Sequence, residues 1–234
     1  MHKVRSILVL FLLSLMHGGV AHAQWVQTNG PNGGMITSFA VSGRNLFAGT
    51  DGGVFLSTNN GTSWTATGLT RAWVSALAVS PNGAGGTNLF AGTYGGGVFL
   101  STNNGTNWSA VNTGLTFLHV HALAVSPNGA GGRNLFAGTE GGVFLSTNNG
   151  TNWSAVNTGL TDTSVVYALA VSGRNLFVGT DGGLFLSTNN GTSWTATGLT
   201  NRRVSALAVS GRNLFAGTEG GGVWRRAISE MITR

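Results

Sequence analysis

The hexapeptide Asn45-Leu-Phe-Ala-Gly-Thr50 decides the fold, because it recurs along the whole chain. It returns at residues 88–93, 134–139 and 213–218, and as NLFVGT at 175–180, at intervals of 43, 46, 41 and 38 residues. A Gly-rich turn and a second apolar run, such as GVFLS at 53–57, follow each copy. A tandem repeat of this length indicates one supersecondary unit stacked several times.

Two further segments complete each unit. The motif STNNGT, followed by Ser or Asn and then Trp, begins at residues 57, 101, 146 and 187, and a segment ending in GLT follows each Trp. A run such as VSALAVS at 74–80 then leads into the next hexapeptide. We name the four predicted strands A (74–80 and its equivalents), B (45–50), C (53–57) and D (from the Trp). Four strands in about 42 residues is the size of a propeller blade.

Strand A is rich in Ala and Ser, and small residues suit the innermost strand, where blades converge. Five B strands predict an all-β, five-bladed propeller over residues 24–226, followed by a short tail at 227–234. The last unit ends at Val223-Trp224 without a D strand, whereas Trp25-Val26-Gln27 resembles a D strand that precedes the first A strand. We therefore predict that Trp25 pairs beside Val223 and closes the ring, which removes an open sheet edge.

Composition narrows the class of protein. The 234 residues include 39 Gly and 3 Pro and no Cys, and 8% are charged. Gly has no three-residue period, which excludes collagen. The net charge of +6 arises from few charges of either sign, and the longest basic runs are Arg202-Arg203 and Arg225-Arg226. Tracking phosphates requires a stripe of cations, so we expect no nucleic-acid partner.

The first 23 residues have the pattern of a secretory signal peptide. A basic MHKVRS precedes the ten-residue apolar run ILVLFLLSLM, and Ala21-His22-Ala23 is an A-x-A cleavage site. Ten apolar residues span only about half of a bilayer core as a helix. We expect cleavage after Ala23, a secreted or periplasmic protein, and no membrane span after removal of the signal.

At STNNGTSW the sequence resembles the Asp-box (BNR) repeat, S/T-x-D-x-G-x-S/T-W/F, of sialidase-like, sortilin-like and photosystem II assembly factor-like propellers. The resemblance implies a propeller in which the motif forms the C–D hairpin, away from the ligand face. Asn replaces the family's Asp at all four positions, which retains an acceptor but loses a charge-assisted bond. The first and third residues of the motif can bond backbone N–H groups, and Asn-Gly tolerates positive φ.

We therefore assign a structural role to these four turns and expect no metal site in them. The assigned residues are Ser57, Asn59, Gly61, Trp64, Ser101, Asn103, Gly105, Trp108, Ser146, Asn148, Gly150, Trp153, Ser187, Asn189, Gly191 and Trp194.

Positions that differ between otherwise similar copies are free of the demands of folding. They concentrate in the D–A loops, the B–C loops and the second residue of strand A, which strand topology places on one face. The candidate ligand-binding residues at these positions are Asp51, Arg71, Trp73, Tyr94, His119, His121, Glu140, Tyr167, Asp181, Arg202, Arg203 and Glu219. The alternative for the carboxylates is turn chemistry, and for the arginines a solvated rim with local ion pairs.

The favoured function is a secreted, non-catalytic scaffold that binds a peptide, protein or glycan on this face and uses no cofactor. A sialidase-like glycoside hydrolase is an alternative, but Tyr94 and Tyr167 lack a matching Glu motif nearby and the loops are short. A passive cell-surface module is the other alternative. His119-x-His121 lacks a third ligand at motif spacing, so no metal is predicted.

Overall fold

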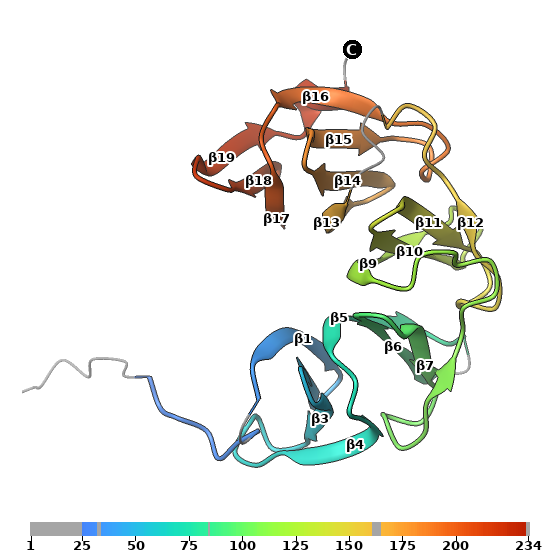
Figure 1. Ribbon diagram of the computed structural model, residues 1–234, viewed down its shortest axis with the longest axis vertical. Helices are drawn as coiled ribbons and strands as arrows, with labels where there is room; N and C mark the ends of the chain where they lie inside the picture. The colour runs from blue at the N-terminus through green and yellow to red at the C-terminus, as the bar shows by residue number, and fades with distance from the viewer. Residues whose placement is uncertain (1–24, 32–33, 84, 161–164, 233–234) are drawn as a thin grey trace, which may run out of the picture.

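The protein is described by a computed structural model that covers residues 25–31, 34–83, 85–160 and 165–232. Its strands form five antiparallel sheets, of which four have four strands and the last has three (Figure 1). The strands are β1 (Ile36–Ser42), β2 (Asn45–Thr50), β3 (Gly53–Ser57), β4 (Thr65–Thr70), β5 (Val74–Pro81), β6 (Thr87–Thr93), β7 (Gly97–Ser101), β8 (Ser109–Ala110), β9 (Val120–Pro127), β10 (Arg133–Thr139), β11 (Gly142–Ser146), β12 (Ser154–Ala155), β13 (Val166–Ser172), β14 (Asn175–Thr180), β15 (Gly183–Ser187), β16 (Thr195–Thr200), β17 (Val204–Ser210), β18 (Asn213–Thr218) and β19 (Gly222–Ala227).

Each sheet is one blade, and its strands pair in sequence order as predicted. Blades 1 to 5 comprise β1–β4, β5–β8, β9–β12, β13–β16 and β17–β19. The D strand is six residues long in blades 1 and 4 and two residues long in blades 2 and 3. In blade 2, the Asn112 side chain extends the short D strand by accepting the Val98 N–H at 2.7 Å and donating to the Gly96 carbonyl at 2.9 Å.

Successive blades pack through their inner strands, and one glycine per interface sets how closely they approach. The Gly of each hexapeptide lies against the first Val of the next blade, so a β-carbon placed on Gly92 would lie 2.6 Å from Val120 Cγ1. The same contact joins Gly49 to Val74, Gly138 to Val166 and Gly179 to Val204. The Phe two residues earlier is fully buried in blades 1 to 4, as Phe47, Phe90, Phe136 and Phe177. These apolar clusters between the blades are the core.

The predicted pairing of Trp25 with Val223 is not present. Trp25 is fully exposed, Val223 is 75% exposed, and β19 pairs with β18 alone among the described residues. The blades form an open arc in which blade 5 lies apart from blade 1 (Figure 1). Four repeats of the same tight glycine–valine contact set the curvature of this arc, and five blades at that curvature do not meet.

The four STNNGT turns have the hydrogen bonds that their sequence predicts. In blade 3, Ser146 Oγ accepts the Gly150 N–H at 2.8 Å and donates to Asn148 Oδ1, which also accepts the Asn152 N–H at 2.9 Å. The other three turns repeat this pattern. Positive φ falls on the Asn-Gly pair of every turn, at 54–57° for the Asn. The motif is therefore a self-contained hairpin, as predicted.

The Trp that ends the motif ties blades 2, 3 and 4 to the preceding blade. Trp153 Nε1 donates to the Val111 carbonyl and Trp194 Nε1 to the Val156 carbonyl, each at 2.7 Å. Trp108 Nε1 lies 3.3 Å from Thr67 Oγ1. These acceptors belong to the D-strand segment of the preceding blade, so each of these three Trp side chains links two blades.

The fifth blade ends differently from the others. In place of a C–D turn, the short helix α1 (Ser229–Ile232) packs beside blade 4, with Met231 buried and Arg226 Nη1 donating to the Thr197 carbonyl at 2.7 Å. Residues 1–23, predicted as a signal peptide, lie outside the described residues. Within the described part of the chain, no helix has the length and apolar character needed to cross a membrane.

We predict that Ser146→Ala destabilises the protein by about 1–3 kcal/mol, because it leaves the buried Gly150 N–H without its acceptor and removes one of the two donors to Asn148 Oδ1. The matched change Asn148→Asp retains both bonds and makes them charge-assisted, so it should stabilise by roughly 0.5–1 kcal/mol. Chemical denaturation of both variants measures the two free energies of unfolding. Equal effects of the two substitutions would contradict the hydrogen-bond account of the turn.

Candidate functional site

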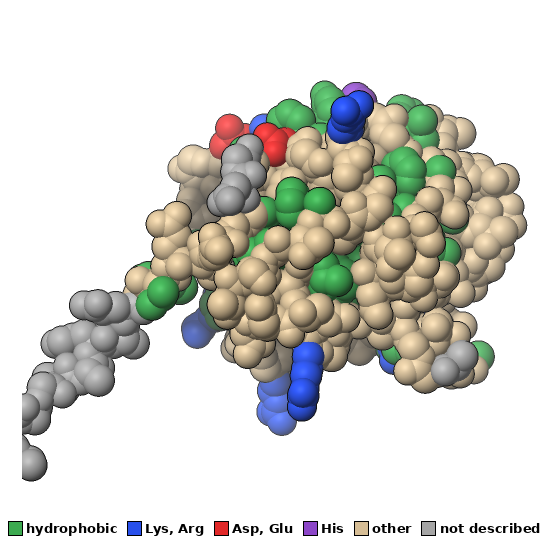
Figure 2. All heavy atoms as spheres, turned by 90° about the horizontal axis from the view of Figure 1, so that it is seen from below, with side chains coloured by type: hydrophobic (Ala, Val, Ile, Leu, Met, Phe, Trp, Pro, Cys, Tyr) green, Lys and Arg blue, Asp and Glu red, His purple; other side chains and the backbone are tan. Residues whose placement is uncertain are grey.

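The B–C and D–A loops lie on one face, as predicted, and their backbones are hydrogen-bonded to each other. The Tyr94 N–H donates to the Trp73 carbonyl at 2.9 Å, and the Glu219 N–H to the Arg203 carbonyl at 3.0 Å. Figure 2 views the disc edge-on and shows acidic and His side chains along its upper margin. Nine of the twelve predicted residues, contributed by blades 2 to 5, form one chain of contacts that we call the rim network. Its members are Trp73, Tyr94, His119, Glu140, His121, Tyr167, Asp181, Arg203 and Glu219.

Three aromatic rings make up the first part of the network. The Tyr94 and His119 rings stack with centroids 4.0 Å apart and planes 19° apart. Trp73 packs on the other side of Tyr94, with ring centroids 5.9 Å apart. Trp73 is 48% exposed and Tyr94 is 56% exposed. The rings therefore form a supported aromatic strip with accessible faces.

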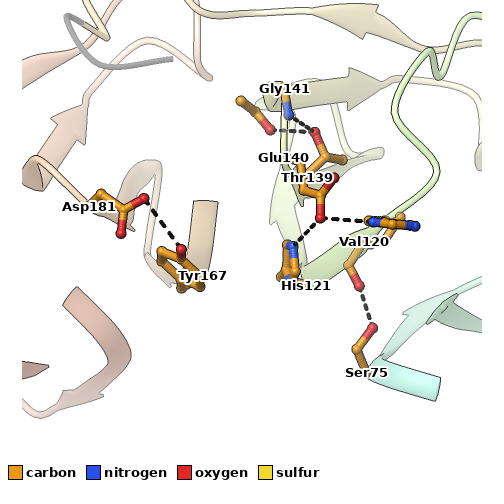
Figure 3. A network of polar contacts seen from close by, with 10 residues as sticks. Ser75, Val120, His121, Thr139, Glu140, Gly141, Tyr167 and Asp181 are labelled. Atoms are coloured by element: carbon orange, nitrogen blue, oxygen red, sulfur yellow. Dashed lines mark hydrogen bonds and ion pairs between the residues drawn. The ribbon is translucent and has the colours of Figure 1, made fainter. Parts of the chain in front are cut away.

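Glu140 connects the aromatic strip to the second half of the network. Its Oε1 lies 2.8 Å from His119 Nδ1 and 3.9 Å from His121 Nε2 (Figure 3). The carboxylate extends from the β10–β11 loop, whereas both imidazoles belong to the strand and loop at the start of blade 3. The His121 ring also packs against Tyr167, with centroids 5.8 Å apart.

Arg203 is the centre of the second half. Its guanidinium carbon lies 3.9 Å above the Tyr167 ring centroid. Its Nε is 3.3 Å from Asp181 Oδ1, and its Nη1 is 3.0 Å from Glu219 Oε2. The Tyr167 hydroxyl donates to Asp181 Oδ2 at 3.3 Å (Figure 3). One cation therefore holds an aromatic ring and two carboxylates from neighbouring blades.

Burial and charge shift the pKa of three network residues. Desolvation lowers the pKa of His121 below 6.5, opposed by Glu140 and assisted by the nearby His119 and Arg203. Desolvation raises the pKa of the Tyr167 phenol. The hydrogen bond to Glu219 raises the pKa of Arg203, so this residue stays cationic. At neutral pH, His121 is therefore held neutral beside a permanent cation.

Three predicted residues do not join the network. Asp51 accepts the Met35 N–H at 3.2 Å in blade 1. Arg71 has a φ of 57° and its backbone N–H donates to the Gly52 carbonyl. Arg202 lies 5.4 Å above the Trp224 ring centroid at the end of the arc. This contact was missed because Trp224 was considered only for closure, although it differs from the Phe at this position in blades 1 to 4.

The opposite face carries a charge pattern that sequence reasoning also missed. Four A–B turns contain an arginine, at Arg44, Arg133, Arg174 and Arg212. Figure 2 shows cationic side chains at the lower margin, opposite the acidic groups. The tripeptide GRN, whose Asn is the first residue of the hexapeptide, occurs in these four turns and is the sequence signal that predicts this cationic face. In the part of the chain that is described, no three His, Asp or Glu side chains are placed to hold one metal ion.

The sequence profile of the DUF6242 beta propeller domain matches residues 17–124 and 130–228. The chain belongs to this family. No match to a curated protein sequence was found. The family assignment agrees with the five antiparallel sheets and does not by itself assign an activity.

Solved structures with a similar fold agree with the propeller architecture. An ancestral GH74 enzyme has 24% identity and a TM-score of 0.68 over 84% of this chain and 30% of its own. The extracellular domain of a putative one component system from B. thetaiotaomicron has 17% identity and a TM-score of 0.69, over 87% of this chain and 28% of its own. YCF48 from Cyanidioschyzon merolae has 18% identity and a TM-score of 0.64, over 88% and 70% respectively. This DUF6242 propeller thus spans less than a third of the first two proteins, and at these identities the likeness concerns the fold.

We predict that the imidazole of His121 titrates below pH 6.5, and that Glu140→Gln lowers its pKa further by removing the negative charge that favours protonation. Because the folded-state pKa is lowered, the contribution of His121 to stability is present above pH 6.5 and is lost as the pH falls below that value. An NMR titration of the imidazole in both proteins measures the two pKa values. A His121 pKa above 6.5 would refute this reading of the network.

Proposed function

We propose that this DUF6242 propeller is a secreted, non-catalytic scaffold that binds a peptide, protein or glycan at the rim network. The observation that carries the proposal is the convergence of exposed aromatic rings and ionic groups from four blades on one face. Exposed aromatic rings supply stacking area for a ligand, and a few oriented polar groups beside them fix its orientation. Stacking on Trp73 and Tyr94 would supply contact area, and the groups around Arg203 would select polar partners.

Two features of the sequence support the secreted location and the class of repeat. Residues 1–23 have the pattern of a signal peptide, and Ser-x-Asn-x-Gly turns with a following Trp match an Asp-box repeat in which Asn replaces Asp. The absence of Cys from the sequence is compatible with export, because the turns are stabilised by their own hydrogen bonds. Detection of the mature protein outside the cytoplasm, beginning at Gln24, would test this part of the proposal.

Hydrolysis by a sialidase-like site is the alternative function, and the contacts of Arg203 argue against it. Asp181, which accepts the Tyr167 hydroxyl, and Glu219 are both engaged by the Arg203 guanidinium. Each would have to leave its ion pair before it could donate a proton or attack a substrate. Turnover of a model sialoside that is lost in Tyr167→Phe would favour hydrolysis over binding.

Glycan and peptide arrays probed with the wild-type protein identify ligand classes. For a ligand found in this way, we predict that Trp73→Ala lowers affinity about 10-fold or more, because it removes an exposed stacking surface. Trp73→Phe should restore part of the loss. The thermal stability of both variants should change little, because the side chain is half-exposed.

We also predict that Arg203→Ala weakens binding of the same ligand, whereas Arg71→Ala does not. Both arginines lie on this face, but only Arg203 is built into the network. Titration calorimetry of the two variants measures the difference. Equal affinities of Arg203→Ala, Arg71→Ala and wild type would place the ligand elsewhere and overturn the proposed site.

A further inference from the structure

The last blade exposes a sheet face that every earlier blade buries. Val223 of β19 is 75% exposed, whereas its equivalents Val54, Val98 and Val143 are at most 1% exposed. Phe215 is half-buried, although the same Phe of the other four blades is fully buried. These residues form the forward face of a blade, which in blades 1 to 4 packs against the next blade. We call the forward face of blade 5 the trailing face of the chain.

The first blade exposes the complementary face. Phe39 is 59% exposed and Val41 is 66% exposed, whereas the equivalent Leu77 and Val79 pack against the apolar cluster between blades 1 and 2. Ile36 is 39% exposed, although its equivalent Val74 is fully buried. We call this surface of blade 1 the leading face. The two faces are the unmatched halves of an interface that the chain forms four times internally.

The glycine–valine contact shows how the two faces would fit together. A β-carbon on Gly49, Gly92, Gly138 or Gly179 would lie 2.6–2.8 Å from a side-chain carbon of the next blade's Val. A β-carbon on Gly217, the equivalent residue of blade 5, would meet only Ala206 within 4 Å, at 3.3 Å or more. Gly217 therefore offers an empty notch of the kind that accepts Val in the other blades, and Ile36 is the residue at the matching position of the leading face.

The two residues Thr28 and Asn29 contact blade 1 at the place where the D strand of a preceding blade contacts the other blades. Thr28 Cγ2 lies 3.4 Å from the site of a β-carbon on Gly61, just as Thr67 Cγ2 of blade 1 lies 2.9 Å from that site on Gly105. Asn29 forms a parallel bridge with Ser63. Thr28 and Asn29 thus anchor the segment on blade 1, whereas Trp25 and Val26 are exposed and could pair with a C strand such as β19, which has an unpaired edge among the described residues.

The leading face of blade 1 also contains a polar group without a hydrogen-bond partner. The Nε1 of Trp108, Trp153 and Trp194 each has an acceptor, and for Trp153 and Trp194 it is a backbone carbonyl of the preceding blade. Trp64 Nε1 is buried and has no hydrogen-bond partner among the described residues. A buried indole N–H without an acceptor is costly. If a docked blade draws residues 25–28 into a D strand, a backbone carbonyl of that strand would accept the Trp64 N–H, as the carbonyls of Val111 and Val156 do for Trp153 and Trp194.

We propose that the trailing face of one copy docks on the leading face of a second copy, with residues 25–28 of the second copy completing the sheet of β19 as its fourth strand. The occupant is a copy of this chain because the interface it would form repeats the four internal ones. Closure of a chain on itself would require the same two faces to meet, but the arc holds them apart (Figure 1). A head-to-tail contact of this kind builds rings or open chains of copies.

Two residues differ between the trailing and leading faces and the equivalent faces inside the arc, and both are compatible with docking of one copy on another. Arg225 stands where blades 1 to 4 have Leu56, Leu100, Leu145 and Leu186, and Phe39 stands where blades 2 to 5 have Leu. Leu56 and Leu77 pack against the same cluster between blades 1 and 2. Across the proposed interface, the Arg225 guanidinium would therefore lie close to the rings of Phe39 and Trp64, which favours a cation–π contact.

Light scattering coupled to size exclusion, over a range of concentrations, tests the proposal. The wild-type protein is expected to show at least twice the monomer mass, whereas Gly217→Val fills the notch and returns the mass to that of a monomer. In an isolated arc, a β-carbon on Gly217 would contact only Ala206, at 3.3 Å, so the variant should fold, and far-UV circular dichroism checks that it does. Ala130→Val, which also introduces a valine but in an exposed A–B turn, should assemble like wild type. A monomeric wild type at every concentration would overturn the proposal.

Complementation separates docking of two copies from closure within one chain. Val223→Asp spoils the trailing face and Phe39→Asp spoils the leading face, and both sites are more than half exposed. Each variant alone should be monomeric with the circular dichroism of wild type. An equimolar mixture retains one intact face of each kind and should double in mass. A mixture that stays monomeric would contradict docking between copies, and this result would not bear on ligand binding at the rim network.

Discussion

The arc depends on the contact between the glycine of each hexapeptide and the first valine of the next blade. The absence of a β-carbon at Gly49, Gly92, Gly138 and Gly179 lets the next inner strand approach within a distance that any other residue would prevent. Because the same pair of residues recurs at each interface, every blade is placed on its neighbour in the same way. The apolar clusters, the order of the loops and the curvature of the arc all follow from that repeated placement.

Uniform packing has a consequence for the loops. The hexapeptides, the STNNGT turns and the fully buried Phe residues are fixed by packing, so variation falls on the B–C and D–A loops. The identical placement of successive blades brings these loops side by side. Contacts such as Tyr94 with His119, or Arg203 with Asp181, therefore join residues of adjacent blades into a continuous surface. The scaffold repeats while its surface does not, as expected of a binding module.

Much of the fold and of the site could be predicted from the sequence, for different reasons. Strand order and turns are encoded locally: Asn60-Gly61 specifies a positive-φ turn wherever it is placed. The grouping of rim residues followed from topology, since equivalent loops lie on the same face. Ring closure could not be predicted from strand counting, because curvature depends on the distance between inner strands and not on the number of blades. The predicted D strand at residues 25–27 is not formed, because Trp25 and Val26 are exposed and only the following Thr28 and Asn29 contact blade 1.

The most direct test of this account is the distance between blades 1 and 5 within one chain. The sequence has no Cys, so paired cysteines at the exposed Arg44 and Arg212 can carry spin labels, with the Arg174 and Arg212 pair of adjacent blades as reference. The labelled chain is diluted into an excess of unlabelled chain, so that only distances within one chain are measured. An open arc predicts a distance between residues 44 and 212 clearly longer than the reference. Equal distances for the two pairs would mean that five blades close into a ring and would contradict the account.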